Sequence, residues 1–140
     1  MNLFQSGNFT LSSGLSSKHK IDCDALTDGD IDTLAAMIRC AVGPFSAAVG
    51  VPRGGLRLAE ALRPFADSEC HTLLIVDDVL STGGSIKRFA AEHCPDDGCA
   101  TVIGAVIFAR GRCPAWVTPL FQTPECLWLT KAIRDIIAAK

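Results

Sequence analysis

The sequence predicts an α/β fold with a mostly parallel β-sheet. Its three most apolar runs cover residues 46–51, 73–76 and 101–109. Continuous apolar runs of this length are typical of strands that are buried on both faces, as in a parallel sheet. Segments with apolar residues at helical spacing lie between these runs. Because strands and helices alternate along the chain, we expect helices to flank the sheet.

The length of the chain sets the number of domains. Its 140 residues, of which 49% are hydrophobic, are enough to enclose one core. Residues 1–24 are rich in Ser and Gly and show little periodicity. We therefore expect a single domain over residues 1–140, in which residues 25–140 form the core and residues 1–24 form a small separate segment.

The first helix has clear signals for its start and its end. Thr27 is a typical N-cap residue, and Asp28 and Asp30 put negative charge into the first turn. Gly43 and Pro44 end the helical pattern. These signals predict a helix that packs against the sheet.

The last part of the chain, residues 114–140, has weaker patterns. We expect an edge strand or two, followed by a C-terminal helix in which Ile133, Ile136 and Ile137 pack inward. Trp116 and Trp128 are candidates for the core or for a dimer interface.

Composition excludes several classes of function. The formal net charge of −2 does not indicate a nucleic-acid partner. No apolar run approaches the ~18 residues of a membrane span, and residues 1–10 lack the features of a signal peptide. The seven cysteines are scattered without a Cys-x-x-Cys pair. We therefore expect a cytoplasmic protein whose cysteines are free thiols, rather than a metal or disulfide framework.

Residues 73–85 form the most informative stretch of the chain. The apolar run 73–76 leads into Asp77 and Asp78, and a hydroxyl-rich turn with paired glycines follows at Ser81–Ser85. Glycines allow a tight turn, and a helix start adds free N–H donors, so this turn is a natural phosphate cradle. The two carboxylates can accept hydrogen bonds from sugar hydroxyls or hold a hydrated Mg²⁺. The alternative is an ordinary strand–helix turn with two solvated aspartates.

This stretch resembles the phosphoribosyl pyrophosphate (PRPP) signature of the type I phosphoribosyltransferases. The resemblance implies that Asp77 and Asp78 hold the ribose hydroxyls, directly or through Mg²⁺ and water. It assigns the 5′-phosphate of PRPP to the residues of the turn, namely Ser81, Thr82, Gly83, Gly84 and Ser85.

A second glycine turn, Pro52-Arg53-Gly54-Gly55, follows the first apolar run. It fits neither the dinucleotide-binding fingerprint nor the Walker loop. It is similar to the pyrophosphate loop of the same family, which implies that Arg53 and Gly54 bind pyrophosphate. Alone, an Arg-Gly-Gly sequence is also common in ordinary turns.

Two further segments resemble the orotate phosphoribosyltransferases. Residues 9–14, Phe-Thr-Leu-Ser-Ser-Gly, are similar to an entry segment that forms a hood over the base in that family. Arg110 follows the third apolar run, where these enzymes place an arginine against the pyrimidine. The resemblance implies that residues 1–24 form a small hood, with base contacts from Ser13, Lys18 and Arg110. In this chain Leu15 and Ser16 replace the basic residues that usually follow the glycine. A solvated N-terminal arm and a solvated strand end are the alternatives.

The connection from Arg63 to His71 is short and contains no lysine. Orotate phosphoribosyltransferases insert a long mobile loop here, with lysines and a histidine that close over the substrate. Arg63 and His71 are the basic residues available for such a role. The alternative is an ordinary surface connection.

Together these resemblances imply a phosphoribosyltransferase that moves the 5-phosphoribosyl group from PRPP to a nucleobase and releases pyrophosphate. Orotate or a similar pyrimidine is favoured, with Mg²⁺ as cofactor, a homodimer as the assembly, and Arg53, Asp77 and Asp78 as the catalytic residues. The short connection favours an alternative, a weak or inactive PRPP-binding or nucleotide-binding regulator. A plain interaction module would bind no PRPP at all.

Overall fold

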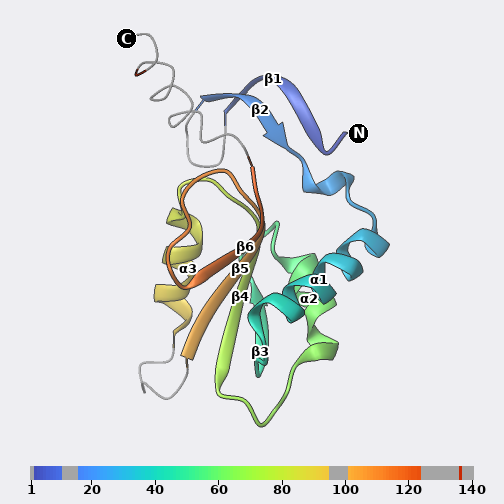
Figure 1. Cartoon of the computed structure of the whole chain (residues 1–140), viewed down its shortest axis with the longest axis vertical. Coiled ribbons are helices and arrows are strands. Elements are labelled where there is room, and N and C mark those ends of the chain that lie inside the picture. The colour runs from blue at the N-terminus through green and yellow to red at the C-terminus, as the bar shows by residue number, and fades with distance from the viewer. Residues whose placement is uncertain (1, 11–15, 95–100, 124–135, 137–140) are drawn as a thin grey trace.

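The computed structural model describes residues 2–10, 16–94, 101–123 and 136. Four parallel strands form one sheet in the order β3-β4-β5-β6, and the N-terminal segment forms a separate antiparallel pair, β1 and β2. Figure 1 shows α1 and α2 on one side of the four-stranded sheet and α3 on the other. The predicted α/β fold with a mostly parallel sheet is therefore confirmed.

The bounds of the elements follow the chain. The strands are β1 (Phe4–Thr10), β2 (Ser16–Ile21), β3 (Ala47–Gly50), β4 (Thr72–Leu80), β5 (Thr101–Ala109) and β6 (Val117–Gln122). The α-helices are α1 (Asp28–Val42), α2 (Leu56–Leu62) and α3 (Gly84–His93), and short 3-10 helices cover Cys23–Ala25 and Arg63–Phe65.

The core lies on both faces of the four-stranded sheet. Successive residues of a strand point to opposite faces, so Leu74 of β4 packs against α1 and α2, whereas Ile75 packs with Ile86 of α3. Both faces of β4 and β5 are thus covered, which explains their continuous apolar runs.

Helix α1 begins and ends where the sequence predicts. The Thr27 Oγ1 accepts a hydrogen bond from the Asp30 backbone N–H at 3.1 Å, and the Asp30 carboxylate accepts one from the Thr27 N–H at 2.9 Å. This reciprocal capping box satisfies two free donors of the first turn. Gly43, with φ of 77°, ends the helix.

Strand β4 is longer than the apolar run that predicts it. The sequence places Asp77 and Asp78 at the end of a strand, but β4 continues to Leu80. Asp77 pairs with Val106 and Leu80 pairs with Ala109 of the equally long β5. The ladder with β5 thus extends the strand through the acidic pair.

The N-terminal segment contains two paired strands, β1 and β2, although its sequence shows little periodicity. Phe4 of β1 contacts Phe108 of β5 edge-to-face, with ring centroids 5.7 Å apart. The described segment lies beyond one end of the four-stranded sheet (Figure 1). The division into a segment over residues 1–24 and a core over 25–140 stays a prediction.

The C-terminal part is described only to residue 123 and at Ile136. β6 is the predicted edge strand, and Trp116 is partly buried against the face that carries α3. Ile136 is helical but 61% exposed, so the prediction that it packs inward is wrong. Trp128 and the other residues of the predicted C-terminal helix lie outside the described residues. Cys23, Cys40, Cys70, Cys94 and Cys113 are free thiols. Within the described ranges, none of the helices is both long and apolar enough to cross a membrane.

Candidate active site

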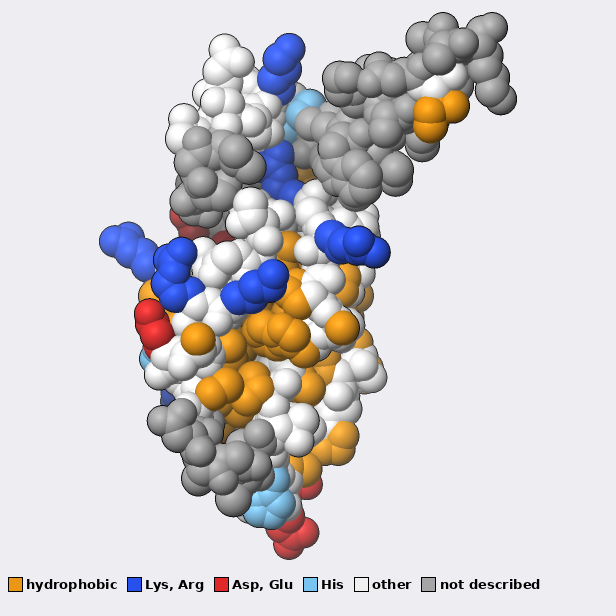
Figure 2. All heavy atoms as spheres, turned by 90° about the vertical axis from the view of Figure 1, so that its left-hand side faces the viewer, with side chains coloured by type: hydrophobic (Ala, Val, Ile, Leu, Met, Phe, Trp, Pro, Cys, Tyr) orange, Lys and Arg blue, Asp and Glu red, His pale blue; other side chains and the backbone are white. Residues whose placement is uncertain are grey.

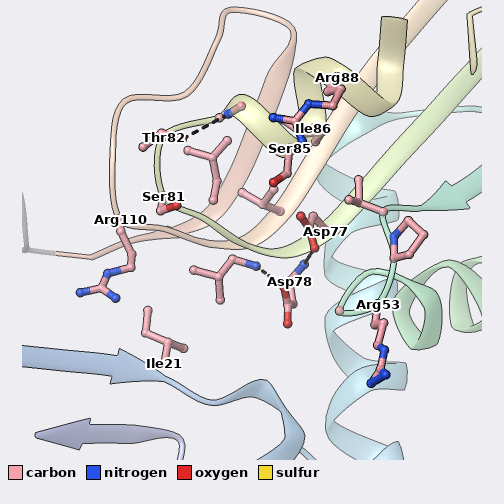
Figure 3. Close-up of a pocket in the computed structure, with 18 of the residues that line it drawn as sticks. Ile21, Arg53, Asp77, Asp78, Ser81, Thr82, Ser85, Ile86, Arg88 and Arg110 are labelled. Atoms are coloured by element: carbon pink, nitrogen blue, oxygen red, sulfur yellow. Dashed lines mark hydrogen bonds between the residues drawn. The ribbon is translucent and has the colours of Figure 1, made fainter. Parts of the chain in front are cut away.

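Three turns meet at the carboxyl ends of three neighbouring strands. Residues 51–55 follow β3, residues 81–83 follow β4, and residues 110–111 follow β5. They border one cavity of about 720 Å³, which is also lined by β1 and β2. Figure 3 shows the side chains in this cavity. In parallel sheets this end of the strands is where ligands bind.

The turn after β3 lies directly against β4. The Val51 N–H donates to the Val76 carbonyl at 2.8 Å, and the Gly55 N–H donates to the Val51 carbonyl at 2.8 Å. A Cβ at Gly54 would overlap the Asp78 carboxylate in its present position, so the glycine allows the turn to approach the acidic pair closely. The peptide bond between Pro52 and Arg53 is cis.

Arg53 is exposed and lies on the side of the cavity away from Arg110 (Figure 3). The turn therefore packs its Gly54 backbone against the acidic pair of β4 and places the Arg53 side chain at the border of the same cavity. A fixed fork of N–H donors suits a pyrophosphate group.

The acidic pair is held by the backbone of its own strand. Asp77 Oδ1 accepts a hydrogen bond from the Asp78 N–H at 2.8 Å, and Asp78 Oδ1 accepts one from the Val79 N–H at 2.7 Å. Burial raises the pKa of Asp77 to about 8, and the side chain of Asp78 acts in the same direction through a hydrogen bond and its negative charge, whereas the hydrogen bond from the Asp78 backbone N–H lowers the pKa. No described residue forms an ion pair with either carboxylate.

These two carboxylates fit a magnesium ion. Their oxygens are the hard ligands that Mg²⁺ prefers, and Mg²⁺ commonly binds through one or two carboxylates together with water and substrate phosphates. The raised pKa of Asp77 shows that the isolated pair lacks a compensating positive charge. A hydrated cation would supply that charge.

The turn after β4 forms a cradle at the start of α3. Gly83 has φ of +82°, a conformation that favours glycine, and its carbonyl accepts a hydrogen bond from the Lys87 N–H at 3.1 Å. Thr82 Oγ1 lies 3.4 Å from the Gly84 nitrogen that donates to it. Helix α3 has neither a side-chain N-cap nor an acidic residue in its first turn. Its first N–H groups and its dipole therefore favour an anion.

Arg110 connects the third turn to the N-terminal strands. Its backbone N–H donates to the Leu80 carbonyl at 2.7 Å, and its Nη2 donates to Ser17 Oγ of β2 at 2.7 Å. A Cβ at Gly111 would overlap the Ser81 carbonyl, so the turn after β5 packs closely against the turn after β4. Gln122 Nε2 donates to the Gly111 carbonyl at 3.2 Å.

The structure thus brings most of the predicted site residues together. The cavity is lined by Arg53, Gly54, Asp77, Asp78, Ser81, Thr82, Gly83, Gly84, Ser85 and Arg110. Lys18 borders a separate hollow of about 410 Å³ on β1 and β2, and not the main cavity. Ser13 lies outside the described residues.

Two basic residues of the cavity were not among the predicted site residues. Lys20 reaches it from β2 and Arg88 reaches it from α3. A signal for Arg88 exists in the sequence, since it stands three positions after Ser85 and so shares its face of the helix. For Lys20 only the pairing of β1 and β2 reveals the position.

The connection between α2 and β4 lies away from this cavity. It enters β4 at Thr72, at the opposite end of the strand from Leu80 (Figure 1). Arg63 pairs with Glu60 at 3.0 Å, and the His71 carbonyl accepts a hydrogen bond from the Thr101 N–H at 3.0 Å. Neither residue lines the cavity, so the structure favours an ordinary surface connection.

Comparison with solved structures identifies the fold. Orotate phosphoribosyltransferase from Aeropyrum pernix matches with a TM-score of 0.66 and 23% identity, over 92% of this chain and 93% of that chain. The chain has the fold of the type I phosphoribosyltransferases. Orotate phosphoribosyltransferase from Mycobacterium tuberculosis H37Rv matches with a TM-score of 0.60 and 17% identity, over 87% and 90% of the two chains.

The phosphoribosyltransferase fold is shared by proteins named for other bases. Xanthine-guanine-hypoxanthine phosphoribosyltransferase from Helicobacter pylori matches with a TM-score of 0.53 and 18% identity, over 76% of this chain and 92% of that chain. No protein-family model and no curated protein matches the sequence. The resemblance inferred from the motifs is thus confirmed at the level of the fold.

Proposed function

We propose that this protein transfers the 5-phosphoribosyl group from PRPP to a nucleobase and releases pyrophosphate. The observation that carries the proposal is the order of groups around one cavity. Around the cavity the groups come in the order anion cradle (Ser81–Ser85), acidic pair (β4) and Arg53 turn. The parts of PRPP come in the same order, namely 5′-phosphate, ribose and pyrophosphate. The shared fold with phosphoribosyltransferases supports the same assignment.

Each part of PRPP has a group of matching chemistry. The backbone N–H groups and hydroxyls of Ser81–Ser85 would bind the 5′-phosphate. Asp77 and Asp78 would accept hydrogen bonds from the ribose hydroxyls. The guanidinium of Arg53 and the backbone at Gly54 would bind pyrophosphate.

The chemistry would depend mainly on positioning and electrostatics. A nitrogen of the base forms a bond to C1 of the ribose while the bond from C1 to pyrophosphate breaks. Asp77 and Asp78 would stabilise the positive charge that develops on the ribose ring, and Arg53 would neutralise the departing pyrophosphate. Magnesium, held by the two carboxylates through water, would add positive charge at the leaving group.

Orotate or a similar pyrimidine is the base that we favour. Arg110 and the N-terminal strands lie on the side of the cavity opposite Arg53 (Figure 3), and a guanidinium is suited to carbonyl and carboxylate oxygens. Ser13 and Lys18 stay assigned to the base by resemblance. A homodimer in the cytoplasm remains part of the proposal.

One observation favours a second candidate, a PRPP-binding or nucleotide-binding regulator. The connection between Arg63 and His71 lies at the far end of the sheet from the cavity. It therefore provides no lid to exclude water from the reacting groups.

A base-panel assay tests these proposals. The protein is incubated with PRPP, Mg²⁺ and orotate, uracil, or a purine base, and pyrophosphate release is measured beside PRPP binding by calorimetry. Release with orotate, lost in Asp77→Asn/Asp78→Asn, supports the enzyme. Binding of PRPP without release from any base supports the regulator, and the absence of binding contradicts both.

A further inference from the structure

Helix α3 begins with an unusual distribution of charge. Its first turn contains no acidic residue, and Lys87 and Arg88 follow directly. Cations near the N-terminus oppose the helix dipole, which is why acidic residues are preferred there. On the face that carries α3, basic side chains form a band above a hydrophobic area (Figure 2). The start of α3 is therefore arranged to receive negative charge from outside the chain.

The two basic side chains differ in their position. Arg88 lines the main cavity, whereas Lys87 does not. Side chains of a helix lean toward its N-terminus, so a residue covers the turn that precedes it. Arg88 accordingly lies beside Ser85 in Figure 3, over the first turn of α3. The Lys87 side chain extends toward Gly83, with its Cε 3.9 Å from the place where a Cβ of that residue would be, but it does not line the cavity.

The Arg88 side chain takes part in no interaction that would stabilise the fold within the described ranges. It is exposed, and within the described ranges it forms neither an ion pair nor a hydrogen bond. A guanidinium beside free N–H donors, with no carboxylate to pair with it, matches a phosphate monoester, which accepts several charge-assisted hydrogen bonds at once.

We propose that Arg88 is a binding residue for the 5′-phosphate and places a guanidinium over the cradle formed by Ser81–Ser85. The ligand class is a pentose 5-phosphate. This inference rests on the proposed function for the identity of the phosphate-bearing ligand. It adds a charged side chain to a cradle otherwise made of backbone N–H groups and hydroxyls, so the cavity would select phosphorylated pentoses over unphosphorylated ones.

Calorimetry with fragments of the substrate tests the proposal. The wild type, Arg88→Ala, Arg88→Lys and the matched control Lys87→Ala are each titrated with ribose 5-phosphate, ribose and pyrophosphate. We expect Arg88→Ala to weaken ribose 5-phosphate about tenfold, because it loses charge-assisted hydrogen bonds. Arg88→Lys should lose less, since it keeps the charge without the fork of donors. Pyrophosphate should bind within about twofold of the wild type.

The control separates a specific contact from general attraction. Lys87→Ala removes the same charge from the neighbouring position and should change ribose 5-phosphate binding by less than about twofold. Arg88→Ala without ligand should melt at or above the temperature of the wild type, because it removes a cation from the positive end of a helix. Equal losses in Arg88→Ala and Lys87→Ala would overturn the proposal. So would a loss of pyrophosphate affinity in Arg88→Ala without a loss of ribose 5-phosphate affinity.

The result is independent of turnover. Ribose 5-phosphate binding that depends on Arg88, with no pyrophosphate release from any base, would reject the proposed enzyme and keep this assignment. Pyrophosphate release with an unchanged KM for PRPP in Arg88→Ala would support the proposed enzyme and reject the assignment of Arg88.

Discussion

The two sides of the cavity are built in different ways. The side proposed to bind PRPP consists of turns that follow β3, β4 and β5, and the last residues of β4 and β5, Leu80 and Ala109, are buried. The other side consists of β1 and β2, most of whose residues are exposed. Contacts that join this side to the core include Phe4 with Phe108 and Arg110 with Ser17.

This contrast suits two different tasks, the binding of PRPP on one side and the binding of the base on the other. Turns that are packed against one another and against a buried sheet can hold phosphates, ribose and metal in one geometry. A two-stranded segment with exposed side chains is only marginally stable by itself and depends on its contacts with the core. We therefore expect changes on the sheet side to abolish PRPP chemistry, and changes on the side of β1 and β2 to alter the choice and affinity of the base.

The largest effect is expected at the acidic pair. Asp77→Asn/Asp78→Asn removes the charges that would stabilise the ribose ring and hold Mg²⁺, so pyrophosphate release should fall by about 1,000-fold. Initial rates at saturating PRPP and Mg²⁺ measure this. Circular dichroism checks that the fold is kept, and a folded variant with more than a tenth of the wild-type rate would contradict the assignment.

The second-largest effect is expected from a substitution in the turn after β3, which we propose binds pyrophosphate. Gly54→Ala places a Cβ on the Asp78 carboxylate, so either this carboxylate or the turn must move. Because small displacements of reacting groups are costly, kcat/KM should fall by about 100-fold. Gly29→Ala is the matched control, because a Cβ there meets only Thr27 Oγ1 at 3.8 Å. Equal activity in the two variants would show that the turn tolerates displacement.

A smaller and more selective effect is expected on the opposite side. Arg110→Ala should raise the KM for the base about tenfold through the loss of a charge-assisted hydrogen bond, and leave PRPP binding within about twofold. Ser17→Ala, which removes only the 2.7 Å partner of Arg110, should have a weaker effect in the same direction. Steady-state kinetics with base and PRPP varied in turn measures both. If both variants lose PRPP affinity instead, the two sides do not divide the tasks.

The smallest effect concerns stability without ligand. Because the pKa of Asp77 is about 8 in the fold against an ordinary value of 3.8, the folded protein holds this proton more tightly than the unfolded chain. Stability should therefore decrease as the pH rises from about 4 to about 8.

Asp77→Asn should remove much of this dependence and melt a few degrees higher than the wild type at pH 8 in the presence of a chelator. Asp32→Asn, which changes an exposed carboxylate on α1, is the control and should keep the wild-type pH profile. Thermal melts between pH 6 and pH 9 decide this. A lower melting temperature for Asp77→Asn at pH 8 would contradict the prediction.

The features that the sequence predicts best are local. The capping box of Thr27 and Asp30 and the glycine turn at Ser81–Ser85 each arise within a few consecutive residues. Such patterns depend on backbone conformation and on nearby hydrogen-bond donors, so they can be predicted without knowledge of the rest of the chain. The alternation of apolar strands and helices likewise sufficed for the fold class.

Pairing between distant segments could not be predicted in this way. The ladder with β5 carries β4 past Asp77 and Asp78 to Leu80, because hydrogen bonding along two equally long strands outweighs the local change to polar side chains. For the same reason the N-terminal segment pairs as β1 and β2 and brings Lys20 to the cavity, while Lys18 borders a different hollow.

The sequence by itself determined the order of chemical groups in the proposed site, since the acidic pair and the anion cradle are neighbours in the chain. Only the tertiary structure decided which distant groups join them. It places Gly54 against Asp78, joins Arg110 to Ser17, turns Arg88 rather than Lys87 into the cavity, and leaves the connection after α2 at the far end of the sheet. The physical reason is that contacts between strands and turns far apart in sequence depend on register and packing, which no local pattern contains.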